Sequence, residues 1–222
     1  MAQVGSPQQR QPMKLRELEI KLQKVPPHPN PKPELEQYPT PAHIAAMLLY
    51  EALGRGDIEG KRVADLGCGT GILAMGAKML GATEVVGIDI DELAIEIANR
   101  VAHDKELDID FLVGDIEEFD DPVDTVIMNP PFGAQRKHAD MPFLRTALKV
   151  SPVVYSMHMA STKSHVEKAA KALNGVITME TRIEFEIRHM FGFHTKERRS
   201  FEVSLFRFER PGVDPKDRKE RG

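Results

Sequence analysis

The chain has 222 residues, of which 41% are hydrophobic and 29% charged, and its formal net charge is -4. These values are ordinary for a soluble globular protein of one domain. The net charge gives no global sign of nucleic-acid binding, which therefore requires a local basic patch. No apolar run approaches a membrane span, no signal-peptide pattern is present, and the single Cys68 excludes an intrachain disulfide and a Cys-rich zinc site. A cytoplasmic protein is expected.

Both ends of the chain are expected to lie outside the folded domain. Residues 1–12 are rich in Gln, Pro and Gly, which predicts a disordered segment. Residues 211–222 are strongly charged, which predicts a flexible tail. A single domain is therefore predicted over residues 13–210.

The N-terminal part of the domain is expected to contain two helices joined by a linker. Four apolar residues between 15 and 22 fall near helical spacing and predict a short amphipathic helix. Five prolines between residues 26 and 33 predict an extended linker, because proline fixes φ and restricts the preceding residue. A second helix is expected over Pro41–Leu53, with Thr40 as its N-cap and Pro41 at the first helical position.

From residue 61 the chain alternates short apolar runs with longer helical segments. The expected strands are Arg62–Leu66, Glu84–Ile88, Ile109–Val113, Val123–Met128 and Val153–Met157. The expected helices are Ile72–Leu80, Asp91–Asp104, Met141–Lys149 and Ser161–Leu173. This order predicts an α/β fold with a mostly parallel sheet covered by helices on both faces. Two final runs, Val176–Arg188 and Ser200–Glu209, predict a C-terminal antiparallel strand pair.

A glycine-rich turn, Asp65–Gly71, follows the first of these strands. Gly67, Gly69 and Gly71 let the backbone turn tightly and approach a ligand at the carboxyl edge of the sheet. Asp89 ends the next strand, where its carboxylate can accept hydrogen bonds from both ribose hydroxyls. The glycine-rich turn together with Asp89 fits either NAD or S-adenosylmethionine. The spacing G-x-G-x-G differs from the G-x-G-x-x-G of dinucleotide sites, and Asp65 can hold an ammonium group, so S-adenosylmethionine is favoured.

The tetrapeptide Asn129-Pro130-Pro131-Phe132 follows the strand expected at 123–128, at the same edge of the sheet. Consecutive prolines stiffen the backbone and leave carbonyl oxygens as fixed acceptors. The Asn129 amide oxygen and the Pro130 carbonyl can accept from one –NH2 group, and Phe132 can stack on the ring that carries it. A structural turn is the alternative, since Asn-Pro often marks turns. These four residues are the predicted catalytic group.

A basic segment lies between the last two expected strands. The predicted RNA contacts are Arg188, Lys196, Arg198 and Arg199, interleaved with Phe191 and Phe193, and also Arg136 and Lys137 after the catalytic turn. A solvated hairpin loop is the alternative. No cluster of His, Asp and Glu has metal-ligand spacing, so no metal site is predicted, and His158 and His194 are interpreted as structural.

These motifs resemble those of the Rossmann-like, class I S-adenosylmethionine-dependent methyltransferases. The glycine turn and Asp89 are similar to motifs I and II, Asn129–Phe132 to motif IV, and Leu35–Pro41 to motif X, which covers the cofactor's methionine end. The residues that the resemblance assigns to the cofactor are Gln37, Tyr38, Thr40, Asp65, Gly67, Gly69, Thr70, Gly71, Asp89, Ile90, Asp115, Ile116 and Asn129.

From about residue 15 to 209 the chain resembles, more closely, the archaeal and eukaryotic family that makes N6-methyladenosine in small-subunit ribosomal RNA. That resemblance implies methylation of adenine N6 in RNA. For eukaryotic members it also implies a small zinc-binding activator protein. Three alternatives stay open: methylation of a protein glutamine amide or of guanine N2, a non-catalytic RNA-binding protein that retains a cofactor site, and a NAD-dependent reductase.

Overall fold

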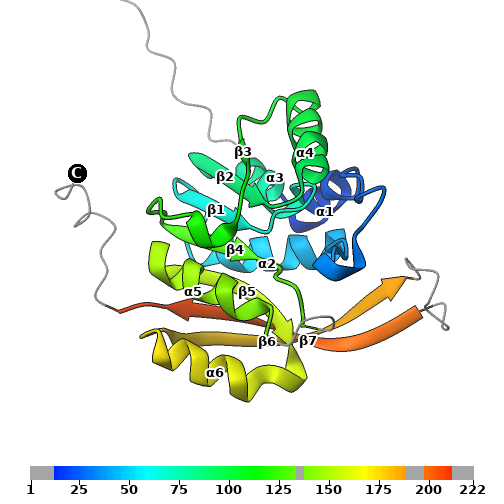
Figure 1. Cartoon of the computed structure of the whole chain (residues 1–222). Helices are drawn as coiled ribbons and strands as arrows, with labels where there is room; N and C mark the ends of the chain where they lie inside the picture. The colour runs from blue at the N-terminus through cyan, green and yellow to red at the C-terminus, as the bar shows by residue number, and fades with distance from the viewer. Residues whose placement is uncertain (1–12, 134–137, 189–197, 212–222) are drawn as a thin grey trace, which may run out of the picture.

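The computed structural model describes residues 13–133, 138–188 and 198–211, without the side chains of residues 185–201. The expected disordered segment 1–12 and the tail from residue 212 lie outside the described residues. Within the described part, seven strands form one sheet in the order β3-β2-β1-β4-β5-β7-β6 (Figure 1). The strands are β1 (Arg62–Leu66), β2 (Glu84–Asp89), β3 (Asp110–Val113), β4 (Thr125–Met128), β5 (Val153–Met159), β6 (Val176–Arg188) and β7 (Arg198–Glu209).

The first five strands run parallel, and β7 and β6 are antiparallel to their neighbours, as the sequence predicts. The central strands are mostly apolar because both of their faces are covered. In β4, Val126 and Met128 pack into one core cluster and Ile127 into the other. Since successive side chains point to opposite faces, strands such as β1, β4, β5 and β7 contribute to both clusters.

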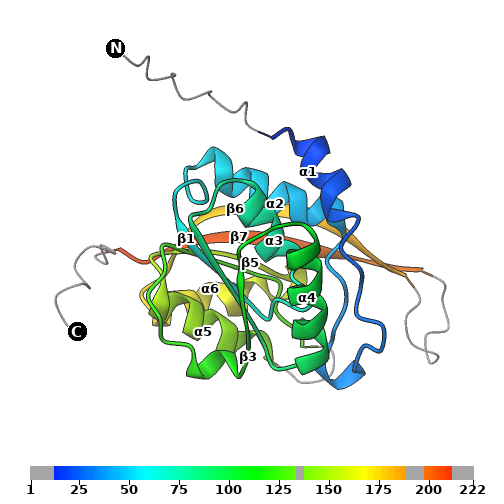
Figure 2. The ribbon, with the colours of Figure 1, turned by 90° about the horizontal axis from the view of Figure 1, so that it is seen from above.

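Helices cover both faces of the sheet. They are α1 (Leu15–Leu22), α2 (Ala42–Gly54), α3 (Ile72–Met79), α4 (Glu92–Asp104), α5 (Asp140–Val150) and α6 (Lys163–Ala172). Short 3-10 turns η1 (Pro33–Leu35), η2 (Ile116–Glu118) and η3 (Ala160–Thr162) connect them. Residues of α1 to α4 join one core cluster and those of η2, α5 and α6 the other. Figure 2 shows α2 and α3 on the opposite side of the sheet from α5 and α6.

The expected helix N-cap at Thr40 is wrong. Helix α2 begins at Ala42 with Pro41 at the N-cap, and no side chain caps it. The Thr40 hydroxyl instead accepts a hydrogen bond from the Asn129 side chain, 2.9 Å away. The tertiary contact takes the hydroxyl that a local capping bond would have used.

Other boundaries also shift by one to three residues, and three of these shifts have a visible cause. Strand β4 begins at Thr125 instead of 123, because the Asp124 carboxylate accepts from the backbone N–H of Arg62 at 2.8 Å. Strand β5 extends to Met159, since β7 pairs with it along its whole length. The last helix begins with the 3-10 turn η3 before α6.

The strand order reverses between β1 and β4. Connections from β1 lead outward to β2 and β3, and those from β4 lead to β5 in the opposite direction. The helices that follow β1 and β4 therefore diverge and leave a crevice beyond the carboxyl ends of these two strands. Ligands of open α/β sheets bind at such a reversal. The glycine turn and Asn129 are the segments that emerge there.

A buried polar cluster ties the parallel part of the sheet to the antiparallel pair. The Tyr155 hydroxyl donates to Asp57 Oδ2 at 2.7 Å, and Arg207 Nε donates to the same oxygen at 2.9 Å. Burial would lower the pKa of Arg207, but hydrogen bonds from Arg207 to Asp57 and Glu209 outweigh it and raise that pKa. Burial, with Asp57 adjacent, also raises the pKa of the Tyr155 phenol. Arg207 is therefore the cation paired with Asp57 and Glu209, and the Tyr155 hydroxyl is a neutral bridge to Asp57.

Removing the cation should weaken the fold more than removing the hydroxyl. We expect Arg207→Met to lower the free energy of unfolding by about 3 kcal/mol, because Asp57 would remain as an uncompensated buried charge. We expect Tyr155→Phe to lower it by about 1 kcal/mol, the usual contribution of one hydrogen bond. Urea denaturation of both variants measures the difference. Equal losses would contradict the assignment of Arg207 as the counter-ion.

Candidate active site

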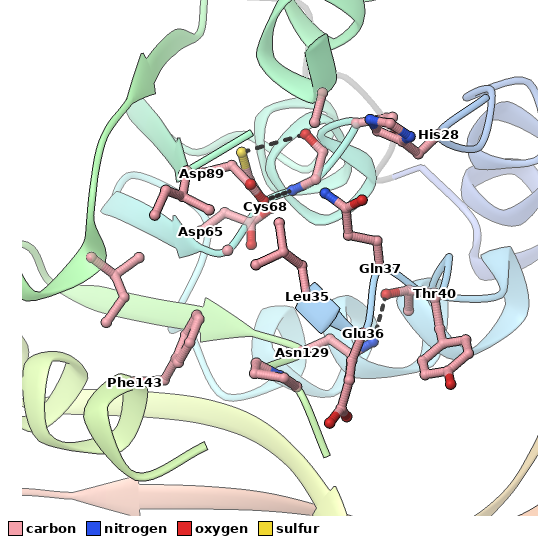
Figure 3. A pocket seen from close by; sticks show the side chains of 18 of the residues that line it. His28, Leu35, Glu36, Gln37, Thr40, Asp65, Cys68, Asp89, Asn129 and Phe143 are labelled. Carbon is pink, nitrogen blue, oxygen red and sulfur yellow. Dashed lines mark hydrogen bonds between the residues drawn. The ribbon is translucent and has the colours of Figure 1, made fainter. Parts of the chain in front are cut away.

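A cavity of about 630 Å³ lies beyond the carboxyl ends of β1 and β4. Its walls are residues 25–28 and 34–40 of the N-terminal linker, the turn after β1, the ends of β2 and β4, residues 114–117, and residues 138–143 at the start of α5 (Figure 3). Segments far apart in the sequence therefore meet around one space. Most of the predicted site residues line it.

Asp65 presents a free carboxylate oxygen in this region. Its Oδ2 accepts from the backbone N–H of Ala74 at 2.9 Å, whereas Oδ1 is buried and has no hydrogen-bond partner among the described residues. Burial raises the pKa of Asp65 to about 7; the Ala74 N–H opposes this shift and Asp89 adds to it. A buried carboxylate with one unused oxygen suits a cationic ligand group.

The glycine turn is held by Asp89. One oxygen of the Asp89 carboxylate accepts from the backbone N–H of Gly69 at 2.7 Å, and the other from Asp91 N–H at 2.9 Å. Burial raises the Asp89 pKa against the effect of these two bonds. Gly67 has φ +69°, and a Cβ there would lie 2.8 Å from the Phe143 ring, so only glycine fits.

The N-terminal linker is anchored to the start of α4. The Asp91 side chain caps α4 and also accepts from Gln37 Nε2 at 3.0 Å and Lys32 Nζ at 2.9 Å. His28 Nε2 lies 3.6 Å from its other oxygen. Burial would raise the Asp91 pKa, but hydrogen bonds from Lys32, Gln37 and Ala94 N–H hold it well below its ordinary value. This anchor was not predicted from the sequence, although Asp91 stands at the start of an expected helix.

The polar atoms of Gln37 and Thr70 are engaged within the protein. The Gln37 side-chain oxygen accepts from Lys32 N–H at 2.7 Å, and its nitrogen reaches Asp91. The Thr70 hydroxyl donates to the Pro26 carbonyl at 2.8 Å. Both residues line the cavity, as Tyr38 does, and both hold the linker over it.

The opposite end of the cavity contains Asn129. Its Nδ2 donates to Thr40 Oγ1, and its Oδ1 is buried without a hydrogen-bond partner in the described part of the chain (Figure 3). Glu36 Oε2 accepts from the backbone N–H of Gly133 at 3.1 Å. Glu36 and Phe143, which also line the cavity, were not predicted. Glu36 adopts a left-handed backbone conformation with φ +50°. No local pattern in the sequence indicates that Glu36 would reach the cavity.

Three residues predicted for the far end of the cofactor lie together. Ile90, Asp115 and Ile116 line the cavity; Ile90 is exposed and Ile116 buried. Asp115 also caps η2, because its Oδ1 accepts from Glu117 N–H at 2.9 Å.

Some predicted residues do not line the cavity. Gly71 is the N-cap of α3, and a Cβ there would lie 2.7 Å from the Phe111 ring, so it serves packing. Pro130 is buried, whereas Pro131 does reach the cavity. Phe132 packs partly buried against the larger core cluster. Its stacking role therefore stays a prediction.

The predicted RNA contacts are only partly placed. Arg136, Lys137 and Lys196 lie outside the described residues. Backbone pairing in the β6–β7 pair sets Arg188 opposite Arg198, with Arg199 next to it, and their side chains are not described. The basic surface stays a prediction.

His158 belongs to a buried chain of hydrogen bonds beside the site. Its ring lies 2.8 Å from Ser156 Oγ and 2.7 Å from Asp140 Oδ2, which joins β5 to the start of α5. This placement agrees with a structural interpretation. In the described residues no group of three or more His, Cys, Asp or Glu side chains can hold a metal ion. No helix there is long and apolar enough to cross a bilayer.

The chain is similar in sequence to a methyltransferase family and to several known proteins. Residues 42–151 match the family described as Methyltransferase small domain. The chain is 40% identical to rRNA N(6)-adenosine-methyltransferase METTL5 of Danio rerio, over 88% of this chain and 99% of that protein. It is 37% identical to Mettl5 of Drosophila melanogaster, over 89% and 97%. It is also 40% identical to an uncharacterized protein of Methanocaldococcus jannaschii, over 91% and 97%.

Solved structures share most of the fold. A protein of Pyrococcus horikoshii, described as a candidate RNA methyltransferase, superposes with a TM-score of 0.84 and 43% identity, over 89% of this chain and 98% of that one. Magnesium protoporphyrin IX methyltransferase from Synechocystis, solved with bound SAM, has a TM-score of 0.62 over 75% and 77%, and its 16% identity shows the fold alone. The chain therefore belongs to the rRNA N(6)-adenosine-methyltransferase family that includes METTL5.

Proposed function

We propose that this protein transfers a methyl group from S-adenosylmethionine to the N6 amino group of an adenine in ribosomal RNA. The observation that carries the proposal is the unpaired, buried Oδ1 of Asn129. It belongs to a residue of the same cavity as the unpaired Oδ1 of Asp65. One is a neutral acceptor suited to an amine, and the other a carboxylate suited to a cation. A site that binds an amine to be methylated and a methyl donor with an ammonium group has a use for both.

The residues present fit S-adenosylmethionine. Asp65 Oδ1 would bind the ammonium group of its methionine part, next to the glycine turn at Gly67 and Gly69. The Asp89 carboxylate, already oriented by two backbone N–H groups, would accept from the ribose hydroxyls. Asp115 would meet the adenine amino group, and Ile90 and Ile116 would flank its ring.

The chain's own contribution to the reaction is to orient the acceptor nitrogen. When bound, S-adenosylmethionine supplies an electrophilic methyl group. Asn129 Oδ1 would accept one hydrogen of the amino group to be methylated, which directs the nitrogen lone pair toward that methyl group. Pro130 does not line the cavity, so the role of its carbonyl as the second acceptor stays a prediction. A strong base is not required, because the proton can leave after the nitrogen has become cationic.

The relatives favour adenine in RNA over the other amine acceptors. The Danio and Drosophila proteins, which align over nearly the whole chain, are named for rRNA N(6)-adenosine. A ribosomal protein L11 methyltransferase of Deinococcus radiodurans matches only 39% of this chain. A protein glutamine amide and guanine N2 remain the alternatives, and the same acceptor oxygens would serve them. A NAD site is disfavoured, because the chain belongs to a methyltransferase family.

We also propose that the predicted basic residues contact the RNA and that a small zinc-binding activator protein binds this chain. The β6–β7 pair supports the first, because its backbone pairing brings positions 188, 198 and 199, all arginine, next to one another. Strand β3 supports the second: it forms one edge of the sheet, and Leu112 and Val113 are 48% and 54% exposed. Exposed apolar side chains on an edge strand are a common place for a partner to bind.

Methyl transfer to ribosomal RNA tests the function. We expect radiolabelled methyl from S-adenosylmethionine to appear as N6-methyladenosine in nucleoside analysis of treated ribosomal RNA. Label in another nucleoside or in protein would still show methyltransferase activity, but it would contradict adenine N6 as the methylated group. If the chain alone transfers none, the same assay with the activator added decides between a missing partner and a non-catalytic role.

Asn129→Ala should abolish turnover without abolishing cofactor binding. The amine to be methylated would lose the Asn129 oxygen that orients it, whereas the contacts of Asp65 and Asp89 with the cofactor would remain. We expect the dissociation constant for S-adenosylmethionine to stay within about tenfold, or roughly 1.4 kcal/mol. Cofactor titration and methyl transfer on the same preparation measure both quantities. Substantial remaining turnover would contradict the assignment.

Cofactor affinity should fall as pH drops below about 7. The pKa of Asp65 is raised to about 7 by burial, and the ammonium group needs the ionised form. Protons bound by the free protein must then leave on binding. Binding at pH 6 should be about fivefold to tenfold weaker than at pH 7.5, where most of an α-amino group is still protonated.

Isothermal titration at the two pH values measures this change, and Asp65→Asn is the control. The variant should bind more weakly at pH 7.5 and lose most of the pH dependence. The folded-state pKa of Asp65 lies above its ordinary 3.8, so ionisation destabilises the free fold as pH rises from about 4 through 7. The variant should accordingly be the more stable protein at pH 8. An unchanged pH dependence would exclude Asp65 as the ammonium partner.

A further inference from the structure

The two ends of the Asn129 amide have different surroundings. Nδ2 donates to Thr40 Oγ1 at 2.9 Å, and Oδ1 is buried with no partner in the described residues. Both Asn129 and Thr40 line the cavity, and Figure 3 shows the bond between them. The amide is thus held at its nitrogen and open at its oxygen.

From this geometry we infer that Thr40 is a positioning residue for the reaction: its hydroxyl holds the Asn129 amide with the oxygen toward the acceptor. The inference rests on the proposed function, in which Asn129 accepts from the amine. It assigns Thr40 a role different from the cofactor contact that its motif predicts. It also explains why Thr40 does not cap α2, since its oxygen is engaged by Asn129.

An asparagine amide needs such a constraint. Rotation by half a turn about its last side-chain bond exchanges oxygen and NH2 with little change in shape. If the Asn129 NH2 pointed toward the amine to be methylated, two hydrogen-bond donors would face each other and the amine could not be oriented. When the Asn129 oxygen points toward the amine to be methylated, the amide NH2 points to Thr40 and needs a hydrogen-bond acceptor there. The Thr40 oxygen supplies it, so in the productive orientation the buried amide nitrogen keeps a hydrogen-bond partner.

A second contact fixes the same pair of segments. Glu36 Oε2 accepts from the backbone N–H of Gly133 at 3.1 Å, and Glu36 is only 7% exposed. The linker therefore holds the catalytic turn at Asn129 through Thr40 and at Gly133 through Glu36. Because Gln37 is bonded to Asp91, the same linker is also tied to the cofactor end of the cavity. Thr40 thus acts on Asn129 from a backbone that is itself anchored.

Replacing the hydroxyl while keeping the shape tests the inference. Thr40→Val removes the acceptor, and Thr40→Ser keeps it. We expect Thr40→Val to reduce kcat at saturating cofactor and RNA by about tenfold to a hundredfold, the effect of one unpaired donor in the reacting orientation. The cofactor dissociation constant should change by less than about threefold, and Thr40→Ser should stay within about threefold of the unaltered chain in kcat.

Thr83→Val is the matched control, because the Thr83 hydroxyl donates to the Lys61 carbonyl at 3.0 Å on the surface, before β2. Its kcat should be unchanged. If valine prevents folding at position 40, Thr40→Ala removes the same hydroxyl without placing an apolar branch there, and the same drop in kcat is expected. Thermal melting of each variant separates loss of fold from loss of rate.

Two outcomes would overturn the inference. In the first, Thr40→Val weakens cofactor binding tenfold or more with kcat intact, which makes Thr40 a cofactor contact. In the second, Thr40→Ser is as slow as Thr40→Val, so the hydroxyl is not the acting group. The unaltered chain in the same assay tests the proposed function separately. Label in an amine other than adenine N6 would overturn that function and leave the Thr40 comparison valid.

Discussion

The parallel pairing of β1 with β4 is the constraint on which the site depends. The register sets Asp65 beside Ile127, so the segments that follow the two strands leave the sheet next to each other. One segment brings a carboxylate with an unused oxygen and the other an amide with an unused oxygen. Unpaired buried polar atoms destabilise a fold unless a ligand uses them. Their presence on both sides of one cavity is a physical reason to regard it as a site for two reactants.

The N-terminal linker completes this cavity from outside the sheet. Its only regular element among the described residues is the short η1, and three of its side chains converge on Asp91 at the start of α4. Two more contacts, from Glu36 and Thr40, reach the turn after β4. The linker therefore spans both ends of the cavity and relates the cofactor side to the acceptor side. A residue in such a segment can serve the reaction without touching the reacting atoms, as we infer for Thr40.

The C-terminal strand pair extends the sheet beyond what the cofactor cavity requires. Strand β7 pairs with β5 along its whole length, and Arg207 joins Asp57 and Tyr155 in a buried cluster. This contact fixes β7 to the parallel part of the sheet. The long β6–β7 pair can then carry the basic residues around 188 and 199 on a rigid base. Rigid strands that carry a binding segment are a common way to separate stability from recognition.

The sequence by itself determined most of the fold and the identity of the chemistry-bearing residues. Period-two and helical apolar patterns are local properties, so the strand and helix order could be predicted, with β1 and β6 correct in their bounds. The family relationship, visible in Asp65–Gly71 and Asn129–Phe132, was confirmed by relatives that align over most of the chain. The alternation of strand and helix also located both motifs at one edge of the sheet.

The tertiary structure decided which polar atoms are used and which are left free. A capping serine or threonine is a local signal, and it gave the wrong partner for Thr40 because Asn129, 89 residues away, offers a donor in a buried setting. The convergence on Asp91 and the free oxygens of Asp65 and Asn129 likewise depend on contacts between distant segments. Glu36 and Phe143 reach the cavity for the same reason. Local pattern determines where elements form, whereas hydrogen-bond partners and burial depend on which elements the fold brings together.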